Sequence, residues 1–173
     1  MRYRPRADVL VLLLLLPAGR LAAQSGVADS SFRAFLPTWE KAVEGMIGGD
    51  TTAFLANASH ADDVTLLTPH GPVVRGWAEV SRHYRFAAAQ MVVNTKVNST
   101  FDYLAVSAQG DWAYIVVIER SEISSVGDTI PQIGVTRVTE VFRRESGQWK
   151  MVHRHMDHLL DQPVKNNPGS KHC

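Results

Sequence analysis

Two histidines separated by one residue on a predicted strand are the first candidates for chemistry in this sequence. His153 and His155 lie in residues 136–158, where apolar and polar residues alternate on both sides of a turn that contains Gly147. This alternation predicts a β-hairpin. Side chains two apart on a strand point to the same side. The residues expected to share that side are Trp149, Met151, His153, His155 and Asp157.

A carboxylate on the first arm of the hairpin is placed to complete an acid–base group. Val138, Glu140 and Phe142 are expected to face the same side as the histidines. An imidazole beside a carboxylate is a general acid–base pair. We therefore predict a candidate catalytic group of His153, His155 and Glu140. The alternative is a buried polar cluster whose members only satisfy one another.

The preceding strand, residues 112–124, completes the lining of a predicted pocket. Its residues expected on the histidine side are Trp112, Tyr114, Val116, Ile118 and Arg120. A mainly apolar hollow with few polar points suits a small, largely apolar organic molecule. The predicted ligand-binding residues are Tyr114, Trp112, Val116, Arg120, Phe142 and Asp157. No cofactor is predicted, and two histidines alone are too few to predict a metal site.

The order of the predicted elements is typical of an α+β domain. A long helix is indicated by an apolar stripe of Phe32, Phe35, Leu36, Trp39, Val43, Met46 and Ile47. A short helix at 51–57, strands at 63–67 and 73–75, a third helix at 77–91, and strands at 92–107, 112–124 and 133–144 follow. We predict a cone-shaped α+β barrel, in which a strongly curved mixed or antiparallel sheet wraps around the long N-terminal helix.

The two ends of the chain are predicted to lie outside this domain. Residues 1–23 combine three early arginines, an apolar run from Val9 to Leu16 and small residues up to Ala23. This pattern is typical of a secretory signal peptide, with a retained short membrane anchor as the alternative. The domain is assigned to residues 24–160, and residues 161–173 are predicted to be a disordered tail. The mature protein is therefore expected to be exported, periplasmic or secreted, without a membrane segment.

Charge and apolar surface bear on the partners of the mature chain. The first 23 residues hold four arginines and one aspartate, so their removal changes the formal net charge from +1 to −2. A slightly acidic chain argues against nucleic acid as a partner. The other side of the strands is predicted to carry Ile115, Val117, Val141, Val152 and Met156. An apolar outer face of a small domain favours association, and we predict a homodimer.

Several local strings, in this order, resemble the SnoaL-like branch of the nuclear transport factor 2-like superfamily. They are Gly49-Asp50, residues 60–65, Pro69-His70-Gly71 with Arg75-Gly76, residues 110–114, residues 137–144 and residues 147–155. The resemblance covers about residues 30–160 and implies the cone-shaped fold predicted above. The hairpin also resembles the association domain of calcium/calmodulin-dependent kinase II, whose two pocket histidines match His153 and His155.

Departures from these families limit what the resemblance implies. Positions of two pocket arginines of the association domain hold Glu140 and Val116, which argues against the same anionic ligands. The base and oxyanion positions of ketosteroid isomerases hold Thr68 and Ala42, which excludes that isomerase chemistry. The sequence thus predicts an exported SnoaL-like domain that binds a small molecule, with no assigned reaction. The alternatives are a cofactor-free isomerase-like or hydrolase-like enzyme, and a non-catalytic homo-oligomerisation module.

Overall fold

The computed structural model describes residues 29–69, 71–91, 95–127 and 129–159. The elements of these residues are α1 (Ser30–Ile47), α2 (Thr52–Ala56), β1 (Thr65–Leu67), β2 (Val74–Arg75), α3 (Trp77–Ala89), β3 (Lys96–Gln109), β4 (Trp112–Ser124), β5 (Gln132–Glu145) and β6 (Gln148–His158). The predicted signal peptide, 1–23, and tail, 161–173, lie outside the described residues. Within the described ranges, none of the helices combines the length and apolar character that crossing a membrane requires.

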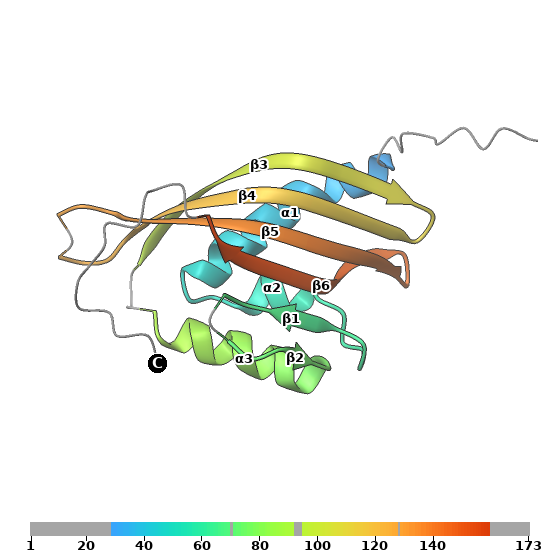
Figure 1. Ribbon diagram of the computed structural model, residues 1–173, viewed down its shortest axis with the longest axis horizontal. Helices are drawn as coiled ribbons and strands as arrows, with labels where there is room; N and C mark the ends of the chain where they lie inside the picture. The colour runs from blue at the N-terminus through green and yellow to red at the C-terminus, as the bar shows by residue number, and fades with distance from the viewer. Residues whose placement is uncertain (1–28, 70, 92–94, 128, 160–173) are drawn as a thin grey trace, which may run out of the picture.

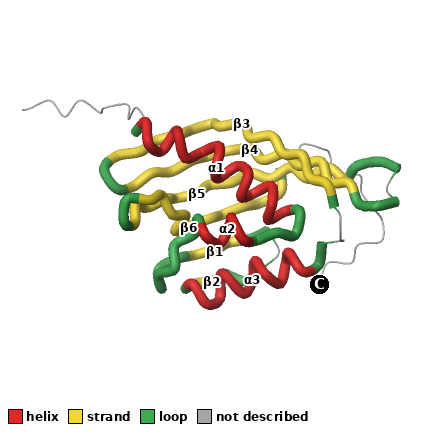
Figure 2. The backbone as a smooth tube through the Cα atoms, turned by 180° about the vertical axis from the view of Figure 1, so that it is seen from behind, coloured by secondary structure: helices red, strands yellow, loops and turns green. Residues whose placement is uncertain are grey.

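The described strands form one six-stranded mixed sheet in the order β2-β1-β6-β5-β4-β3. Neighbouring strands are antiparallel, except that β1 and β6 run parallel. α1 passes behind β3 to β6 in Figure 1, and the helices stand in front of the sheet in the opposite view of Figure 2. We call the helix-covered face of the sheet the inner face and the opposite one the outer face. The predicted α+β class is confirmed.

The predicted apolar stripe of α1 packs against the inner face. Phe32, Trp39 and Val43 are buried along it. The ring of Phe32 lies 5.1 Å, between centroids, from Phe142 of β5 and from Trp149 of β6. Complete burial of one such side chain contributes roughly 1.5–3 kcal/mol. This aromatic group therefore fills the inner face at the end of the sheet that lies near the β5–β6 turn.

A β-bulge in β6 reverses the predicted direction of the two histidines. Phe142 pairs with Met151, but Val141 pairs with His153, so Val152 is an extra residue on β6. One extra residue turns every later side chain to the other face. Before the bulge, Trp149 and Met151 face inward as predicted. After it, Arg154 and Met156 face inward, and the residues that face outward are His153, His155 and Asp157. The predicted common face of Trp149 and the histidines is therefore wrong beyond residue 151.

The facing of β4 also differs from the prediction. Ile115 pairs with Glu140 and Val117 pairs with Val138, and all four are buried on the inner face. The residues predicted to line the inner pocket from β4 instead lie on the outer face, namely Trp112, Tyr114, Val116, Ile118 and Arg120. Residues 114–118 are apolar without interruption, so their pattern could not indicate which alternate set faces the core.

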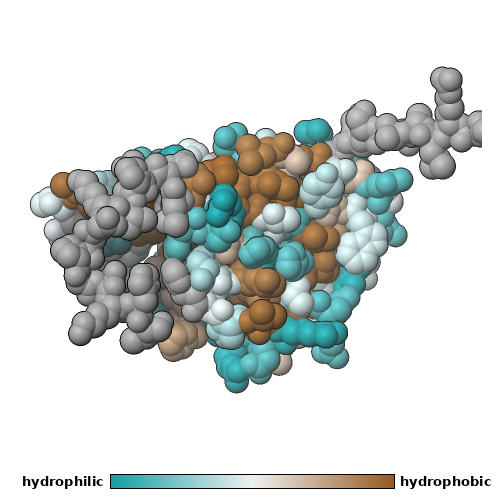
Figure 3. Space-filling model, in the orientation of Figure 1, coloured by the Kyte–Doolittle hydropathy of each residue, from teal (hydrophilic) through white to brown (hydrophobic). Residues whose placement is uncertain are grey.

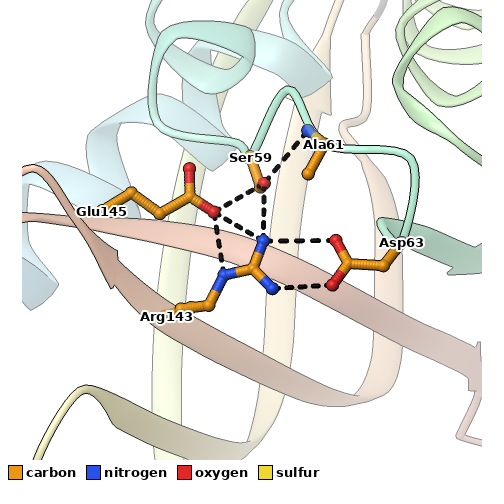
Figure 4. A network of polar contacts seen from close by, with 5 residues as sticks. All are labelled: Ser59, Ala61, Asp63, Arg143 and Glu145. Carbon is orange, nitrogen blue, oxygen red and sulfur yellow. Dashed lines mark hydrogen bonds and ion pairs between the residues drawn. The ribbon is translucent and has the colours of Figure 1, made fainter.

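A polar network fixes the loop between α2 and β1 to the end of β5 (Figure 4). Arg143 donates to both carboxylate oxygens of Asp63, at 2.6 and 3.2 Å, and to Glu145 Oε1 from Nε and Nη2, at 2.9 and 2.7 Å. The hydroxyl of Ser59 donates to Glu145 Oε1 at 2.8 Å and accepts from the amide of Ala61 at 3.2 Å. Because these groups satisfy one another, we assign the network a structural role.

Candidate functional site

A buried ion-pair cluster lies on the inner face at the level of α1. Glu140 of β5 and Arg154 of β6 are cross-strand partners, and Glu119 comes from the next strand, β4. Their exposed fractions are 0%, 1% and 4%. Charged side chains are almost never buried to this extent unless they are paired. Arg154 reaches this face because Val152 is the extra residue of the bulge, so the bulge creates the cluster.

Arg154 joins the two carboxylates through its terminal nitrogens. Its Nη1 donates to Glu140 Oε1, and its Nη2 donates to Glu119 Oε2 at 2.6 Å. The indole Nε1 of Trp39 donates to Glu140 Oε2 at 2.7 Å. Glu140 is thus bound at both oxygens, from β6 and from α1, whereas Glu119 is bound at one.

Two carboxyl groups and one guanidinium give the cluster an excess of negative charge. Burial raises the pKa of Glu140 above its ordinary value, Arg154 opposes this rise, and the charge of Glu119 adds to it. Burial lowers the pKa of Arg154, but the charges of Glu119 and Glu140 raise it by more. Arg154 therefore stays charged, and Glu140 is the group that takes up a proton as the pH falls toward neutrality.

Three atoms at this cluster are buried without a hydrogen-bond partner among the described residues. They are the hydroxyl of Tyr84, Oε1 of Glu119 and Nε of Arg154. The ring of Phe54 lies 4.5 Å from that of Tyr84, and Arg154 Cζ lies 6.0 Å from the Phe54 ring centroid. Burial, with the charges of the two glutamates, raises the pKa of Tyr84 despite Arg154, so it stays a neutral phenol. The cluster therefore offers two donors and one acceptor to a further polar group.

Side chains on the inner face become more accessible beyond Glu119. Its cross-strand neighbours Phe101 of β3 and Thr136 of β5 are only half-buried. Tyr103, one inward position further along β3, is also half-buried and donates to Glu40 of α1 at 2.8 Å. The aromatic end of the core is fully buried by comparison. The cluster thus lies at the boundary between the closed core and the more accessible part of the inner face.

The two predicted catalytic histidines lie on the outer face, across the sheet from Glu140. His153 Nδ1 is 2.8 Å from Thr65 Oγ1, and burial, together with the charge of His155, lowers its pKa. His155 is exposed. The predicted acid–base group of both histidines with Glu140 is therefore not formed. No group of three or more His, Cys, Asp or Glu side chains is placed to hold a metal ion within the described ranges.

The outer face gathers several of the other predicted ligand-binding residues. A shallow depression of about 300 Å³ is lined by Val116, His155 and Asp157 together with Arg137, whose Nε donates to Asp157 at 2.7 Å. Figure 3 shows this side of the molecule, with an apolar area over the central strands that is interrupted by hydrophilic residues. The remaining predicted ligand-binding residues lie outside this depression. Those exposed elsewhere on the outer face are Trp112, Tyr114 and Arg120, and Phe142 is buried in the core.

The residues that form the inner cluster with Glu140 were not identified from the sequence. Glu119 follows the apolar run of β4, and Arg154 stands between two histidines. A charge inside an apolar strand is a signal for a buried pair. Using this signal requires knowing which way the side chains of β4 and β6 face. The uninterrupted apolar run conceals this for β4, and the bulge conceals it for β6. Tyr84 lies within the third helix predicted at 77–91, and its hydroxyl gives no separate signal in the sequence.

Comparison with solved structures shows the same fold in proteins of low sequence identity. A nuclear transport factor 2-like protein of unknown function from Pseudomonas putida has 22% identity and a TM-score of 0.61, covering 78% of this chain and 95% of that one. A proposed dehydratase of the same superfamily from Streptomyces avermitilis has 22% identity and a TM-score of 0.60, covering 76% and 99%. A proposed calcium/calmodulin-dependent protein kinase type II association domain from Thiobacillus denitrificans has 22% identity and a TM-score of 0.57, covering 73% and 94%.

The family is shown by a match over most of the chain. In the search of curated proteins, nothing matches this chain. The SnoaL-like domain matches residues 37–157, from the first turns of α1 to the last residues of β6. The chain therefore belongs to the SnoaL-like domain family and has the nuclear transport factor 2-like fold.

Proposed function

We propose that this protein is an exported domain that binds a small, largely apolar organic molecule on its inner face. The polar group of the ligand contacts Tyr84, Glu119 and Arg154, and its apolar part lies along the half-buried side chains beyond Glu119. Export rests on the pattern of residues 1–23, which is that of a secretory leader.

The observation that carries this proposal is the set of three unpartnered, buried polar atoms from three different elements. Tyr84 belongs to α3, Glu119 to β4 and Arg154 to β6. Leaving a polar atom buried and unpaired costs about 1–3 kcal/mol, and more for a charged group. These costs are reduced when a ligand supplies a donor for Glu119, an acceptor for Arg154, or either kind of group for the hydroxyl of Tyr84. In this proposal the ligand approaches from the side of Phe101, which is half-buried and pairs with Glu119.

Thermal unfolding in the presence of a panel of small organic molecules tests the proposal. A ligand that binds only the native state stabilises it by about 2.7 kcal/mol at one hundred times its dissociation constant. We expect at least one compound to raise the melting temperature of the wild type, and Tyr84→Phe to reduce that shift. Tyr114→Phe is the matched control, because Tyr114 is exposed on the outer face. An unchanged shift in Tyr84→Phe, or no shift with any compound, would overturn the proposal.

A second candidate is proton transfer on the bound molecule. A carboxylate oxygen without a hydrogen bond, such as Oε1 of Glu119, is suited to act as a general base. A carbonyl group at the donors of Tyr84 and Arg154 would accept the electron pair left when Glu119 removes a proton from the adjacent carbon. The test is Glu119→Gln at a saturating ligand concentration, where it should lose exchange of that proton with deuterated water, as followed by NMR. Exchange at the wild-type rate would exclude this role.

A further inference from the structure

Carboxylates outnumber cations on the described inner face. Besides the two carboxylates that flank Arg154, Glu40 and Glu44 of α1 lie at its junction with β3. Glu40 accepts from the hydroxyl of Tyr103 at 2.8 Å, and Glu44 accepts from the backbone amide of Ser99 at 3.2 Å. Among the described residues, neither Glu40 nor Glu44 forms an ion pair. Four carboxyl groups therefore accompany one guanidinium.

Three of these carboxylates, of Glu40, Glu119 and Glu140, act on a common side chain, Tyr103. Burial raises the pKa of its phenol first, followed by the hydrogen bond to Glu40 and then the charges of Glu40, Glu140 and Glu119. One half-buried side chain is thus influenced by carboxylates from α1, β4 and β5. A field of one sign in a partly enclosed region attracts ligands of the opposite sign.

Two further features of the same region point to a ligand. Oε1 of Glu119 and the hydroxyl of Tyr84 are unpartnered, and the two residues are only 4% and 3% exposed. Phe101 pairs with Glu119 across the strands, and Tyr103 follows two residues further along β3, so aromatic side chains lie next to Glu119 on this face. A carboxylate oxygen accepts a short, strong hydrogen bond from an ammonium group, and aromatic rings attract the same cation.

We infer, building on the proposed function, that the ligand of the inner face is a small organic ammonium ion with an apolar body. Its N–H groups donate to Oε1 of Glu119 and to the hydroxyl oxygen of Tyr84, which accepts as well as donates. Its apolar body contacts Phe101 and Tyr103. An anionic ligand of the same size is disfavoured, because the four carboxyl groups of this region, of Glu40, Glu44, Glu119 and Glu140, outnumber its one guanidinium.

Three probes of nearly equal size test this inference by calorimetry on the mature chain: 2-phenylethylammonium, 2-phenylethanol and phenylacetate. We expect the ammonium ion to bind at least about tenfold more tightly than the other two probes, because a close charge pair at an interface contributes at least that much to affinity. Glu119→Gln should weaken the ammonium ion about tenfold and leave the alcohol unchanged. Glu122→Gln is the matched control, because Glu122 lies on the same strand, exposed on the outer face, and should change neither affinity.

The outcomes separate the inference from the proposed function. If the alcohol or phenylacetate binds as tightly as the ammonium ion, or if Glu119→Gln keeps the full preference, the positive ligand is excluded and the proposed binding site stands. If none of the three probes binds, the inference fails and the melting panel alone decides the proposed function. If Glu119→Gln does not fold, Glu40→Gln replaces it, because Glu40 is only half-buried; retention of the full preference there would equally overturn the inference.

Discussion

Replacement of Arg154 by methionine should destabilise the fold strongly, and less so in acid. The change removes the cation between two buried carboxyl groups, of Glu140 and Glu119. Removing one partner of a buried ion pair costs about 3–5 kcal/mol. Without Arg154, Glu140 is expected to be protonated in the folded state. Holding that proton at pH 7, against an ordinary pKa of about 4.3, costs up to about 3.7 kcal/mol, but only about 1 kcal/mol at pH 5.

Urea unfolding of the wild type and the variant at both pH values measures these differences. We expect a loss of about 3–5 kcal/mol for Arg154→Met at pH 7. The loss should be smaller at pH 5 by less than about 1 kcal/mol, because Glu140 of the wild type, whose pKa is raised to about 7, gains most of the same stability over this range. Arg137→Met is the control, because Arg137 forms an exposed pair with Asp157 on the outer face, and such pairs contribute about 0.2–1 kcal/mol. Equal losses for the two variants would refute the buried cluster.

Four further predictions follow from the same geometry. Folding raises the pKa of Glu140, so protonation of this group stabilises the folded state. The stabilisation is complete below the unfolded pKa of about 4.3 and is lost as the pH rises through the folded pKa. Denaturant unfolding from pH 4 upward should show this decline in the free energy of unfolding, and Glu140→Gln should remove the decline. His153→Ala and His155→Ala lie across the sheet from the proposed site, so calorimetry should find ligand affinity unchanged; a large loss would move the site to the outer face. Asp63→Asn weakens a partly exposed ion pair and should cost less than about 1 kcal/mol in thermal unfolding at neutral pH; because hydrogen bonding to its arginine partner lowers the pKa of Asp63, the difference should vanish as the pH falls below that value, and a difference that persists in acid would contradict the assigned pairing. The homodimer stays a prediction: sedimentation should show a dimer that Tyr114→Glu, on the exposed outer face, converts to a monomer, and a monomeric wild type would contradict it.

The order of elements could be predicted because it depends on local patterns. The stripe from Phe32 to Ile47 has helical spacing, and the structure forms α1 there. The alternation around Gly147 predicted the hairpin that β5 and β6 form. Turns with glycine at positive φ, such as Gly110 and Gly147, separate the long strands. These signals record what the backbone requires locally, so each can be recognised without knowing the packing of the strands.

The candidate site could not be predicted in the same way, because it depends on the facing of the strands. One extra residue, Val152, exchanges the positions of His155 and Arg154 between the two faces. An alternating sequence carries no mark of such a bulge, since Trp149 to Asp157 reads equally well without it. Of the predicted catalytic group, only Glu140 remained on the inner face, and there its partner is a guanidinium and not an imidazole.

NMR titration of the mature chain with 2-phenylethylammonium tests the central claim most directly. Carbon-13 labels on the carboxyl groups of glutamate and on the rings of tyrosine and histidine report both faces in one experiment. We expect the signals of Glu119 and Tyr84 to shift with a common saturation curve, while those of His155 and Tyr114 stay constant. Shifts confined to His155 and Tyr114 would contradict an inner-face binding site.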